Sequence, residues 1–169
     1  MPELIEVDWL DARAVAQRDA MNAETGAMYA AFTGGNTPEV NAAIDAALAV
    51  DPASIVYTVI AVEGERVVGH TALRPVPGSA SRSLEVKKVF VEPDRRGTGV
   101  ARALLADAER YAREHGATSL VLQTGPLQVD AIALYEKIGY VAIAPFGAYT
   151  VIPGALCFEK DLDSARTAG

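Results

Sequence analysis

The sequence predicts an α/β domain with a central mixed, largely antiparallel sheet of about six or seven strands flanked by about four helices. Strand-like and helix-like segments alternate along all 169 residues, in the approximate order βααβββαβαββ. Half of the residues are apolar, which supplies a core, and the length is typical of one domain. No repeat or low-complexity tract separates a second unit. We therefore expect a single domain over residues 1–163 and a flexible tail over residues 164–169.

The amino-terminal part of the chain carries the weaker structural signals. Its first helix is rich in alanine and only weakly amphipathic. The second helix is better marked, because Thr37 is suited to the N-cap, Pro38 to the first helical position, and Asp51-Pro52 to its end. Glu63-Gly64-Glu65 is a hairpin signal between two apolar runs. We expect strands at 4–10, 54–62 and 66–74, and helices at 11–22 and 38–50.

The carboxyl-terminal part is more strongly patterned. Ser83 to Val91 is rich in valine and ends at Glu92-Pro93. From Ala101 onward, apolar residues recur at helical spacing with arginines on the other faces, and Gly116 ends this helix. Gly139 ends a shorter one. The elements expected here are strands at 83–91, 118–123, 140–144 and 155–160, and helices at 101–115 and 130–138.

Charge and composition exclude several classes of protein. The 22 acidic and 15 basic residues give a formal charge of −7, which argues against nucleic acid or an anionic membrane as a partner. The longest strongly apolar run, Ile55 to Val62, is far shorter than the ~20 residues of a membrane span. An acidic start is unlike a signal peptide, so we expect a cytoplasmic protein.

The sequence offers no obvious metal site. Cys157 is the only cysteine, which excludes an intramolecular disulfide and a cysteine cluster, and we expect it to be a buried, inert thiol. The two histidines lie far apart in sequence, without a ligand pattern around them. We expect His70 to be packed within a strand and His115 to lie at a helix C-terminus.

A basic loop stands out in this acidic chain. Five of the fifteen basic residues fall within the sixteen residues from Lys87 to Arg102. Gly97 and Gly99 lie between a strand and a helix N-terminus, where unpaired backbone N–H groups suit a phosphate. The loop therefore indicates an anionic ligand, although a turn with solvated arginines has the same residues.

Three phosphate-binding patterns can be compared with this loop. No G-x-x-x-x-G-K-[ST] string of the Walker type occurs. The dinucleotide pattern G-x-G-x-x-G/A fails, because Arg102 stands at its last position and no acidic residue ends the next strand. Arg96 to Ala101 do satisfy a third pattern, [QR]-x-x-G-x-[GA].

That third pattern is one of three strings, from Leu84 to Tyr140, that resemble the GCN5-related N-acetyltransferase (GNAT) family. The other two are Glu85 to Val91 and Ala131 to Tyr140. All three in order are a strong signal. Gln123 to Gln128, with Phe146 to Tyr149 downstream, resembles a bacterial subgroup of small-molecule acetyltransferases. The resemblance implies acetyl-CoA as the cofactor, with coenzyme A as product, and a GNAT-like fold.

The resemblance also implies cofactor-binding residues. The strand ending at Val91 would pair with the pantetheine arm through Val89, Phe90 and Val91, and the family splays its sheet there. The apolar alternation slips at Lys87-Lys88, as a β-bulge would make it do. Phosphate contacts would come from the loop and the helix start, and Gln128 stands where many relatives have asparagine. The implied loop residues are Arg96, Gly97, Thr98, Gly99, Val100, Ala101 and Arg102.

Two residues match positions that carry chemistry in the family. Tyr135 matches a tyrosine near the thioester sulfur, where a phenol would donate a proton to the departing thiolate. The alternative is a tyrosine that packs a short helix. Glu85 matches the general base of some members; an amine must lose a proton before it attacks, and a water chain would serve equally. The alternative for Glu85 is a surface carboxylate.

The acceptor end of the site is the least determined. By position, Glu24, Tyr29, Phe146 and Tyr149 are candidates for substrate binding, although the last two would serve equally as loop anchors. The sequence predicts an N-acetyltransferase that acts on a primary amine of a small molecule. A non-catalytic acetyl-CoA-binding module that acts through a partner is the alternative, and nicotinamide binding would instead indicate a dinucleotide oxidoreductase. A homodimer is compatible with the family.

Overall fold

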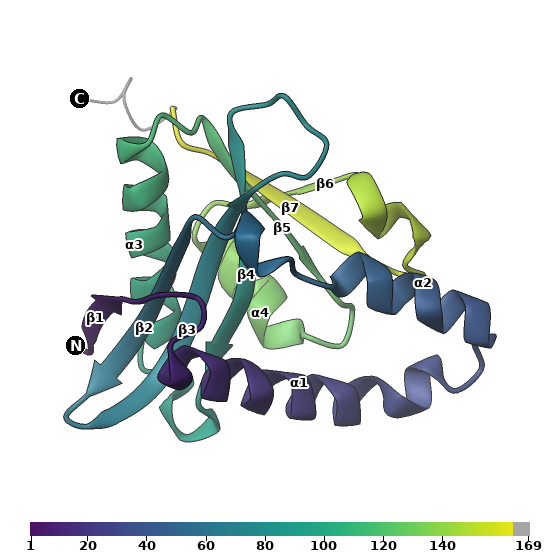
Figure 1. Cartoon of the computed structure of the whole chain (residues 1–169), viewed down its shortest axis with the longest axis horizontal. Helices are drawn as coiled ribbons and strands as arrows, with labels where there is room; N and C mark the ends of the chain where they lie inside the picture. The colour runs from purple at the N-terminus through teal and green to yellow at the C-terminus, as the bar shows by residue number, and fades with distance from the viewer. Residues whose placement is uncertain (164–169) are drawn as a thin grey trace.

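The computed structural model describes residues 1–163, so the tail predicted at 164–169 lies outside the described part of the chain. Within it, seven strands form one sheet in the order β1-β2-β3-β4-β5-β7-β6, and four α-helices flank the sheet (Figure 1). Only β4 and β5 pair in parallel. The predicted mixed α/β architecture is therefore confirmed. The strands are β1 (Glu3–Glu6), β2 (Tyr57–Glu63), β3 (Arg66–Pro75), β4 (Ser83–Val91), β5 (Ser119–Thr124), β6 (Val141–Ile143) and β7 (Leu156–Asp161).

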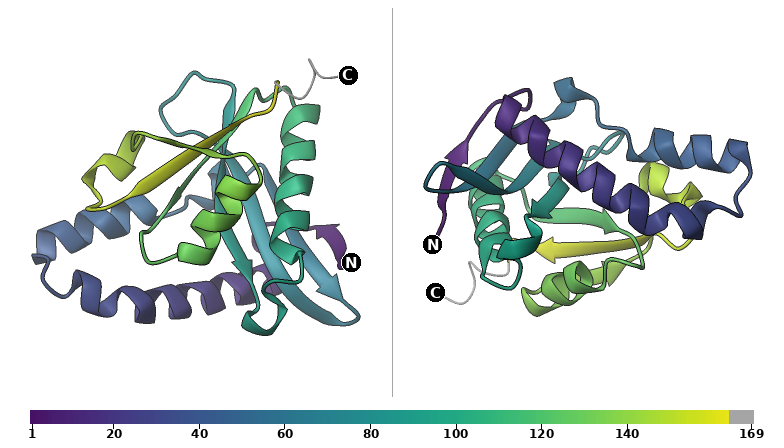
Figure 2. Two further views of the ribbon diagram at one scale, coloured as in Figure 1. Left: turned by 180° about the vertical axis from the view of Figure 1, so that it is seen from behind. Right: turned by 90° about the horizontal axis from the view of Figure 1, so that it is seen from below.

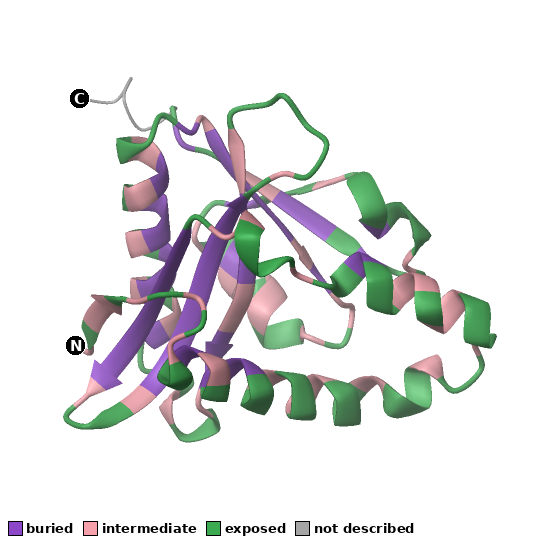
Figure 3. Cartoon of the chain, in the orientation of Figure 1, coloured by how far each residue is buried: buried purple, intermediate pink, exposed green. Residues whose placement is uncertain are grey.

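The helices lie on both faces of the sheet. They are α1 (Ala12–Thr33), α2 (Pro38–Leu48), α3 (Val100–Glu114) and α4 (Val129–Lys137). Helices α3 and α4 cover one face, and α1 crosses the other (Figure 2). The larger core lies under α3 and α4, whereas the smaller core holds Ala14 of α1 against Ile60 and Val62. Burial is accordingly concentrated in the central strands and α3, while α1 is exposed along most of its length (Figure 3).

The first two elements differ from the prediction. Strand β1 ends at Glu6, because the Asp8 carboxylate accepts the backbone N–H of Leu10 at 2.7 Å and turns the chain there. Helix α1 continues to Thr33, eleven residues beyond the expected end at Asn22. Its second half has no buried residue, and it therefore lacks the apolar periodicity from which helices are recognised.

Other boundaries follow local hydrogen bonds. Thr37 is the N-cap of α2 and accepts the Val40 N–H at 3.3 Å, as predicted. The second strand begins at Tyr57, not at Ser54, because Pro52–Ser54 form a short 3-10 helix capped by Asp51. A further 3-10 helix, η3 (Gly147–Val151), lies between β6 and β7 and was not predicted from any sequence pattern.

The predicted slip in β4 is a β-bulge. Lys88 has a φ of 56°, and the pairing with β3 shifts between His70 and Ala72. On its other edge β4 pairs with β5 only from Ser83 to Glu85. The two strands separate beyond that point, and the sheet is open where the site lies.

Candidate active site

A cleft of about 1290 Å³ runs through this opening in the sheet. One end lies between the loop that follows β4 and the starts of α3 and α4. The other end is enclosed by the second half of α1, by α2, and by Ile152, Pro153 and Ala155 before β7. We call these the loop end and the helix end. Val86 and Tyr135 line the stretch between β4 and α4.

The loop end is shaped by two glycines in left-handed conformations. Gly97 has a φ of 76° and Gly99, the N-cap of α3, has a φ of 96°. A Cβ at either position would meet no atom within 4 Å, so steric space does not require glycine here. The positive φ favours glycine instead, and the absence of a side chain leaves the backbone exposed at the cleft wall. The first N–H groups of α3 lie at this wall, an arrangement suited to phosphate. The Arg102 side chain is exposed here and makes no hydrogen bond to any described residue.

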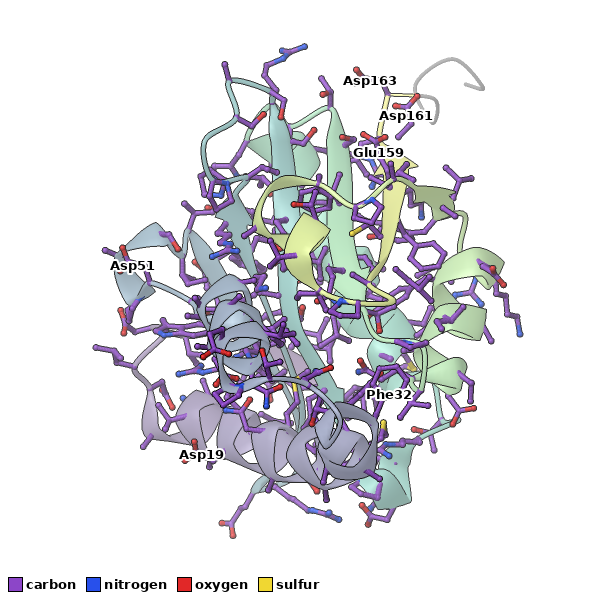
Figure 4. The ribbon with its side chains drawn as sticks, turned by 90° about the vertical axis from the view of Figure 1, so that its right-hand side faces the viewer. Asp19, Phe32, Asp51, Glu159, Asp161 and Asp163 are labelled. Atoms are coloured by element: carbon purple, nitrogen blue, oxygen red, sulfur yellow. The ribbon has the colours of Figure 1, made fainter. Side chains whose placement is uncertain are left out.

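The cleft is basic although the chain is acidic. Six basic side chains line it against two acidic ones, Asp45 and Asp130, within a chain of net charge −7. The acidic residues labelled in Figure 4 do not line it, and Phe32 is labelled there near the end of α1. A concentration of positive charge in a cleft attracts a polyanion such as a phosphorylated cofactor. The basic lining residues are Lys87, Lys88, Arg95, Arg96, Arg102 and Lys137.

Arg96 connects the loop to α1. Its Nη2 donates to both oxygens of Glu24, at 2.9 and 2.7 Å, and its Nε donates to the Val91 carbonyl at 3.0 Å. Its guanidinium also lies 5.8 Å from the centroid of the Phe90 ring. Glu24 is therefore placed beside the loop and does not line the cleft, and neither does Phe90. Val89 and Val91 both line it.

Tyr135 reaches the cleft from the buried face of α4. Its ring packs in the larger core near Tyr140 and Phe158 and is only 5% exposed. Burial raises the pKa of its phenol above the ordinary value, so the group stays protonated near neutral pH. Its hydroxyl has no hydrogen-bond partner among residues 1–163. A protonated, unpartnered phenol can donate to an anion in the cleft.

The loop between β5 and α4 is closed by Gln128. Its Oε1 accepts the Gly125 N–H at 3.1 Å and the Thr124 hydroxyl at 3.2 Å. The amide nitrogen has no partner within the described chain, and Gln128 lines the cleft, so one N–H₂ group is available to a ligand.

Tyr29 joins this loop to α1 across the helix end. Its hydroxyl accepts the Leu127 N–H at 3.0 Å, and a Cβ on Gly125 would lie only 1.9 Å from the same oxygen. Gly125 is therefore required for this approach. Tyr29 lines the cleft, and Gly125 and Pro126 form the wall next to it.

Glu85 lies beneath the cleft wall in a buried cluster. Its Oε2 accepts from Arg74 Nε at 2.8 Å, while its Oε1 accepts from the Tyr149 hydroxyl and lies 3.5 Å from Lys87 Nζ. Lys87 Nζ also donates to the Tyr149 oxygen at 2.7 Å. Burial lowers the pKa of Lys87 to about 8, despite the opposing effect of Glu85. Of these four residues, only Lys87 lines the cleft.

The structure thus divides the candidate residues into two groups. Lining the cleft are Tyr29, Val89, Val91, the loop from Arg96 to Arg102, Gln128 and Tyr135, whereas Glu24, Glu85, Phe90, Phe146 and Tyr149 do not line it. Phe146 packs edge-on against Tyr149, with ring centroids 5.2 Å apart, and both hold η3 in place. Cys157 and His70 are buried, as predicted, and His115 is exposed after α3.

Several lining residues were not predicted from the sequence. They come from the helix end, where Met21, Asn22 and Thr25 of α1 face Ile44, Asp45 and Leu48 of α2 across the cleft. Their only sequence signal is spacing at three and four residues within each helix. Lys87 and Lys88 were counted in the basic loop, but no role at the helix end was assigned to them.

The family can be decided from the sequence comparison. Residues 16–140 match the sequence profile of the acetyltransferase (GNAT) family. The chain belongs to this family. Among curated relatives, it is 45% identical over 78 residues to an IAA acetyltransferase of Azospirillum brasilense and 40% identical over 84 residues to YjgM, an uncharacterized N-acetyltransferase of Escherichia coli. The matches cover 46% and 50% of the chain, and 51% and 50% of the relatives, so the chain matches about half of their length.

Solved structures show the same GNAT fold. A proposed acyl-CoA N-acyltransferase from Klebsiella pneumoniae aligns with a TM-score of 0.74 and 25% identity, over 96% of this chain and 98% of that one. The PaiA N-acetyltransferase of Thermoplasma acidophilum, solved with coenzyme A, aligns with a TM-score of 0.64 and 14% identity, over 94% and 99% of the two chains. Members of the GNAT family use acetyl-CoA, and the basic, glycine-walled loop end of the cleft fits its phosphates.

Residues 1–163 contain neither a cluster of metal-ligating side chains nor a helix suited to a membrane. No group of three or more histidine, cysteine, aspartate or glutamate side chains is arranged to hold a metal ion. None of the four helices combines the length and the apolar character that a membrane crossing needs.

Proposed function

We propose that this GNAT protein transfers the acetyl group of acetyl-CoA to a primary amine of a small molecule, by direct attack of the amine. The observation that carries the proposal is the continuity of the cleft. Its basic loop end, the unpartnered Tyr135 hydroxyl and the enclosed helix end open into one another. A cofactor and an acceptor would therefore meet beside Tyr135.

Residues of the loop end would bind the cofactor, which supplies an activated acetyl group as a thioester. Backbone N–H groups from Arg96 to Ala101 would hold its phosphates, and Arg102 is free to reach one of them. The unpaired edge of β4 beyond Glu85 would orient the pantetheine arm by strand addition. Gln128 would offer its amide N–H₂ group.

Tyr135 would act as the proton donor to the departing sulfur. Its phenol is held protonated by burial, and no described residue competes for its hydrogen. The incoming amine must lose a proton, and two routes are open to it. Glu85 does not line the cleft and already accepts from Arg74 and Tyr149. We therefore favour water in the cleft as the route, with Glu85 fixing the positions of Lys87 and Tyr149.

The first test is cofactor binding. Acetyl-CoA is expected to raise the melting temperature of the wild-type protein, and Gly99→Trp is expected to abolish this rise, because an indole would fill the loop end. Gly78→Trp is the matched control, since Gly78 also has a positive φ and open space but does not line the cleft. A wild-type protein that binds no coenzyme A species by calorimetry would refute the proposal.

The second test is the role of Tyr135. Tyr135→Phe is expected to lower kcat about 10²-fold or more, the usual contribution of a general acid, with acetyl-CoA affinity changed less than about twofold. Tyr140→Phe is the control, because the Tyr140 hydroxyl is buried, has no partner in the described chain and does not line the cleft. Turnover is measured as release of free thiol with a panel of amines. Equal turnover of both variants would remove Tyr135 from the mechanism. A wild-type protein that binds acetyl-CoA but releases no thiol with any amine would favour the alternative of a non-catalytic acetyl-CoA-binding module.

A further inference from the structure

The bulge in β4 places two consecutive lysines in the same cleft. Neighbouring residues of a regular strand point to opposite faces of the sheet. At Lys88, the positive φ and the shifted register interrupt this alternation, and both Lys87 and Lys88 line the cleft. Lys88 Nζ lies 3.3 Å from the side-chain oxygen of Asn22 in α1, and Lys87 Nζ contacts Tyr149 of η3. The ammonium group of Lys88 is therefore directed toward α1, and that of Lys87 toward η3, whose C-cap residue Ile152 lines the helix end.

The cluster around Lys87 carries one positive charge in excess. Two cations, Arg74 and Lys87, share the single carboxylate of Glu85, and Tyr149 is held neutral because burial raises the pKa of its phenol. The side chains of Arg74 and Lys87 are each 8% exposed, and that of Glu85 is fully buried. An unmatched positive charge with so little access to water is unfavourable unless an anion approaches it.

Lys87 has hydrogen-bonding capacity to spare. An ammonium group has three N–H donors. One of them is directed at the Tyr149 oxygen at 2.7 Å, and the Glu85 oxygen at 3.5 Å is the other described neighbour. Lys87 is the one member of its cluster that lines the cleft. With a pKa of about 8, its charged form predominates at pH 7.

The opposite wall of the helix end carries a single acidic lining residue, Asp45 of α2. Besides Asp45, the lining residues of α1 and α2 are uncharged. The helix end therefore presents two lysines on its sheet side and one carboxylate on its helix side. A ligand that carries one negative and one positive group matches this arrangement.

We infer that the acceptor is an amino carboxylate, whose carboxylate is bound by Lys87, and beside it Lys88, at the helix end of the cleft. A single negative charge equals the single excess positive charge of the Arg74–Glu85–Lys87 cluster. The carboxylate would also fix the amine relative to Tyr135, so Lys87 determines specificity without touching the reacting atoms. This inference rests on the proposed function and adds to it the chemical class of the acceptor.

The test compares acceptors with the same side chain in which the carboxylate is kept, amidated or removed. Because the three amines differ in pKa, kcat/KM is expressed per unprotonated amine. Phenylalanine, phenylalaninamide and phenethylamine, and the equivalent trio built on leucine, are supplied with acetyl-CoA. The wild-type protein is expected to favour the acids in kcat/KM by about 10-fold or more, the usual strength of a charge-assisted hydrogen bond. Lys87→Met, which keeps the apolar stem, is expected to bring the acid-to-amide ratio to within about twofold, mainly by raising KM for the acid.

Two further variants separate a specific role from general damage. Lys87→Arg keeps the charge and is expected to restore most of the preference for acids. Lys160→Met removes another partly buried lysine, which pairs with Glu109 away from the cleft, and is expected to leave the preference unchanged. Unaltered acetyl-CoA binding by Lys87→Met shows that the variant is folded. The inference is overturned if amides and simple amines are acetylated as well as the acids, or if Lys87→Met leaves the ratio unchanged.

A separate readout distinguishes this inference from the proposed function. If no compound is acetylated although acetyl-CoA binds, the proposed function fails for this panel. The complex with coenzyme A is then titrated with the same compounds. If the wild-type complex binds acids about 10-fold more tightly than amides, and Lys87→Met loses this difference, the carboxylate site is supported independently of the proposed function. Equal binding of acids and amides overturns it.

Discussion

Helices α3 and α1 differ in how they are attached to the sheet. Helix α3 buries six of its fifteen residues, among them Leu104 and Leu105, and it begins in the glycine loop. Helix α1 buries three of its twenty-two residues, all before Asp19, and two of these are Gln17 and Arg18. The helix that carries the loop end is thus part of the core, whereas the helix that encloses the other end is buried only near its start. Buried packing is therefore concentrated next to the loop end, where we propose that the cofactor binds.

The largest expected effect tests this difference in packing. Leu104→Ala removes a fully buried side chain under which Gly69 packs closely, and is expected to lower the free energy of unfolding by about 3–4 kcal/mol. Met28→Ala, in the exposed half of α1, is expected to change it by less than about 0.5 kcal/mol. Urea denaturation of both variants measures the contrast. A comparable loss in the two variants would show that α1 is attached along its whole length.

The second expected effect concerns the buried start of α1, whose contribution to the free energy of unfolding depends on pH. Arg18 Nη1 donates to His70 Nε2 at 3.2 Å, and His70 Nδ1 donates to the Lys88 carbonyl at 2.8 Å, which requires a neutral ring. Burial lowers the pKa of His70 to about 4 from the usual 6.5. The unfolded chain therefore binds the proton first. Stability from this group is complete above pH 6.5 and is lost as the pH falls toward 4.

Between pH 7 and 4.5, this histidine is expected to reduce the free energy of unfolding by about 2–3 kcal/mol. Urea denaturation at several pH values measures the slope. His70→Gln should flatten it, whereas His115→Gln, at the exposed histidine, should retain it. A slope unchanged by His70→Gln would mean that carboxylates alone account for the acid sensitivity.

The smallest expected effect concerns the hydrogen bond between Leu127 and Tyr29, which lies in the second half of α1. Gly125→Ala displaces Tyr29 and its hydrogen bond with Leu127, so amide hydrogen exchange in residues 21–33 is expected to become about fivefold faster. Gly35→Ala, where a Cβ meets no atom within 4 Å, is the control. Exchange in α3 should not change. Equal exchange of α1 in the two variants would show that Tyr29 does not hold this helix.

The features that could be predicted from the sequence belong mainly to the loop end and α3, whereas those that could not belong mainly to the helix end and the buried cluster around Glu85. The loop from Arg96 to Ala101, the slip at Lys87-Lys88 and the amphipathic stripe of α3 are local patterns, and each lies within about ten residues. The buried cluster is not local, since Arg74, Glu85 and Tyr149 come together from two strands and η3. The approach of Tyr29 to Gly125 joins residues 96 positions apart. No periodicity predicts such contacts, and the helix end was therefore left open.

The acidic composition illustrates a related limit. A net charge of −7 predicts no general polyanion-binding surface, yet six basic residues gather in one cleft. Charge counted over a chain says nothing of its distribution. The basic loop could be recognised because its members are close in sequence. The excess positive charge near Lys87 arises because Arg74 and Lys87 share the carboxylate of Glu85. These pairings are known only from the folded structure.

The confinement of buried residues to the start of α1 has a consequence for how such proteins diverge. Because no residue of this helix after Arg18 is buried, substitutions from Met21 to Thr33 would disturb the core of the sheet little. The polar contacts of this segment, Asn22 with Lys88, Glu24 with Arg96 and Tyr29 with Leu127, would have to be kept or replaced together. We therefore expect the α1 lining of the helix end to vary among members of the family more readily than the glycine loop before α3.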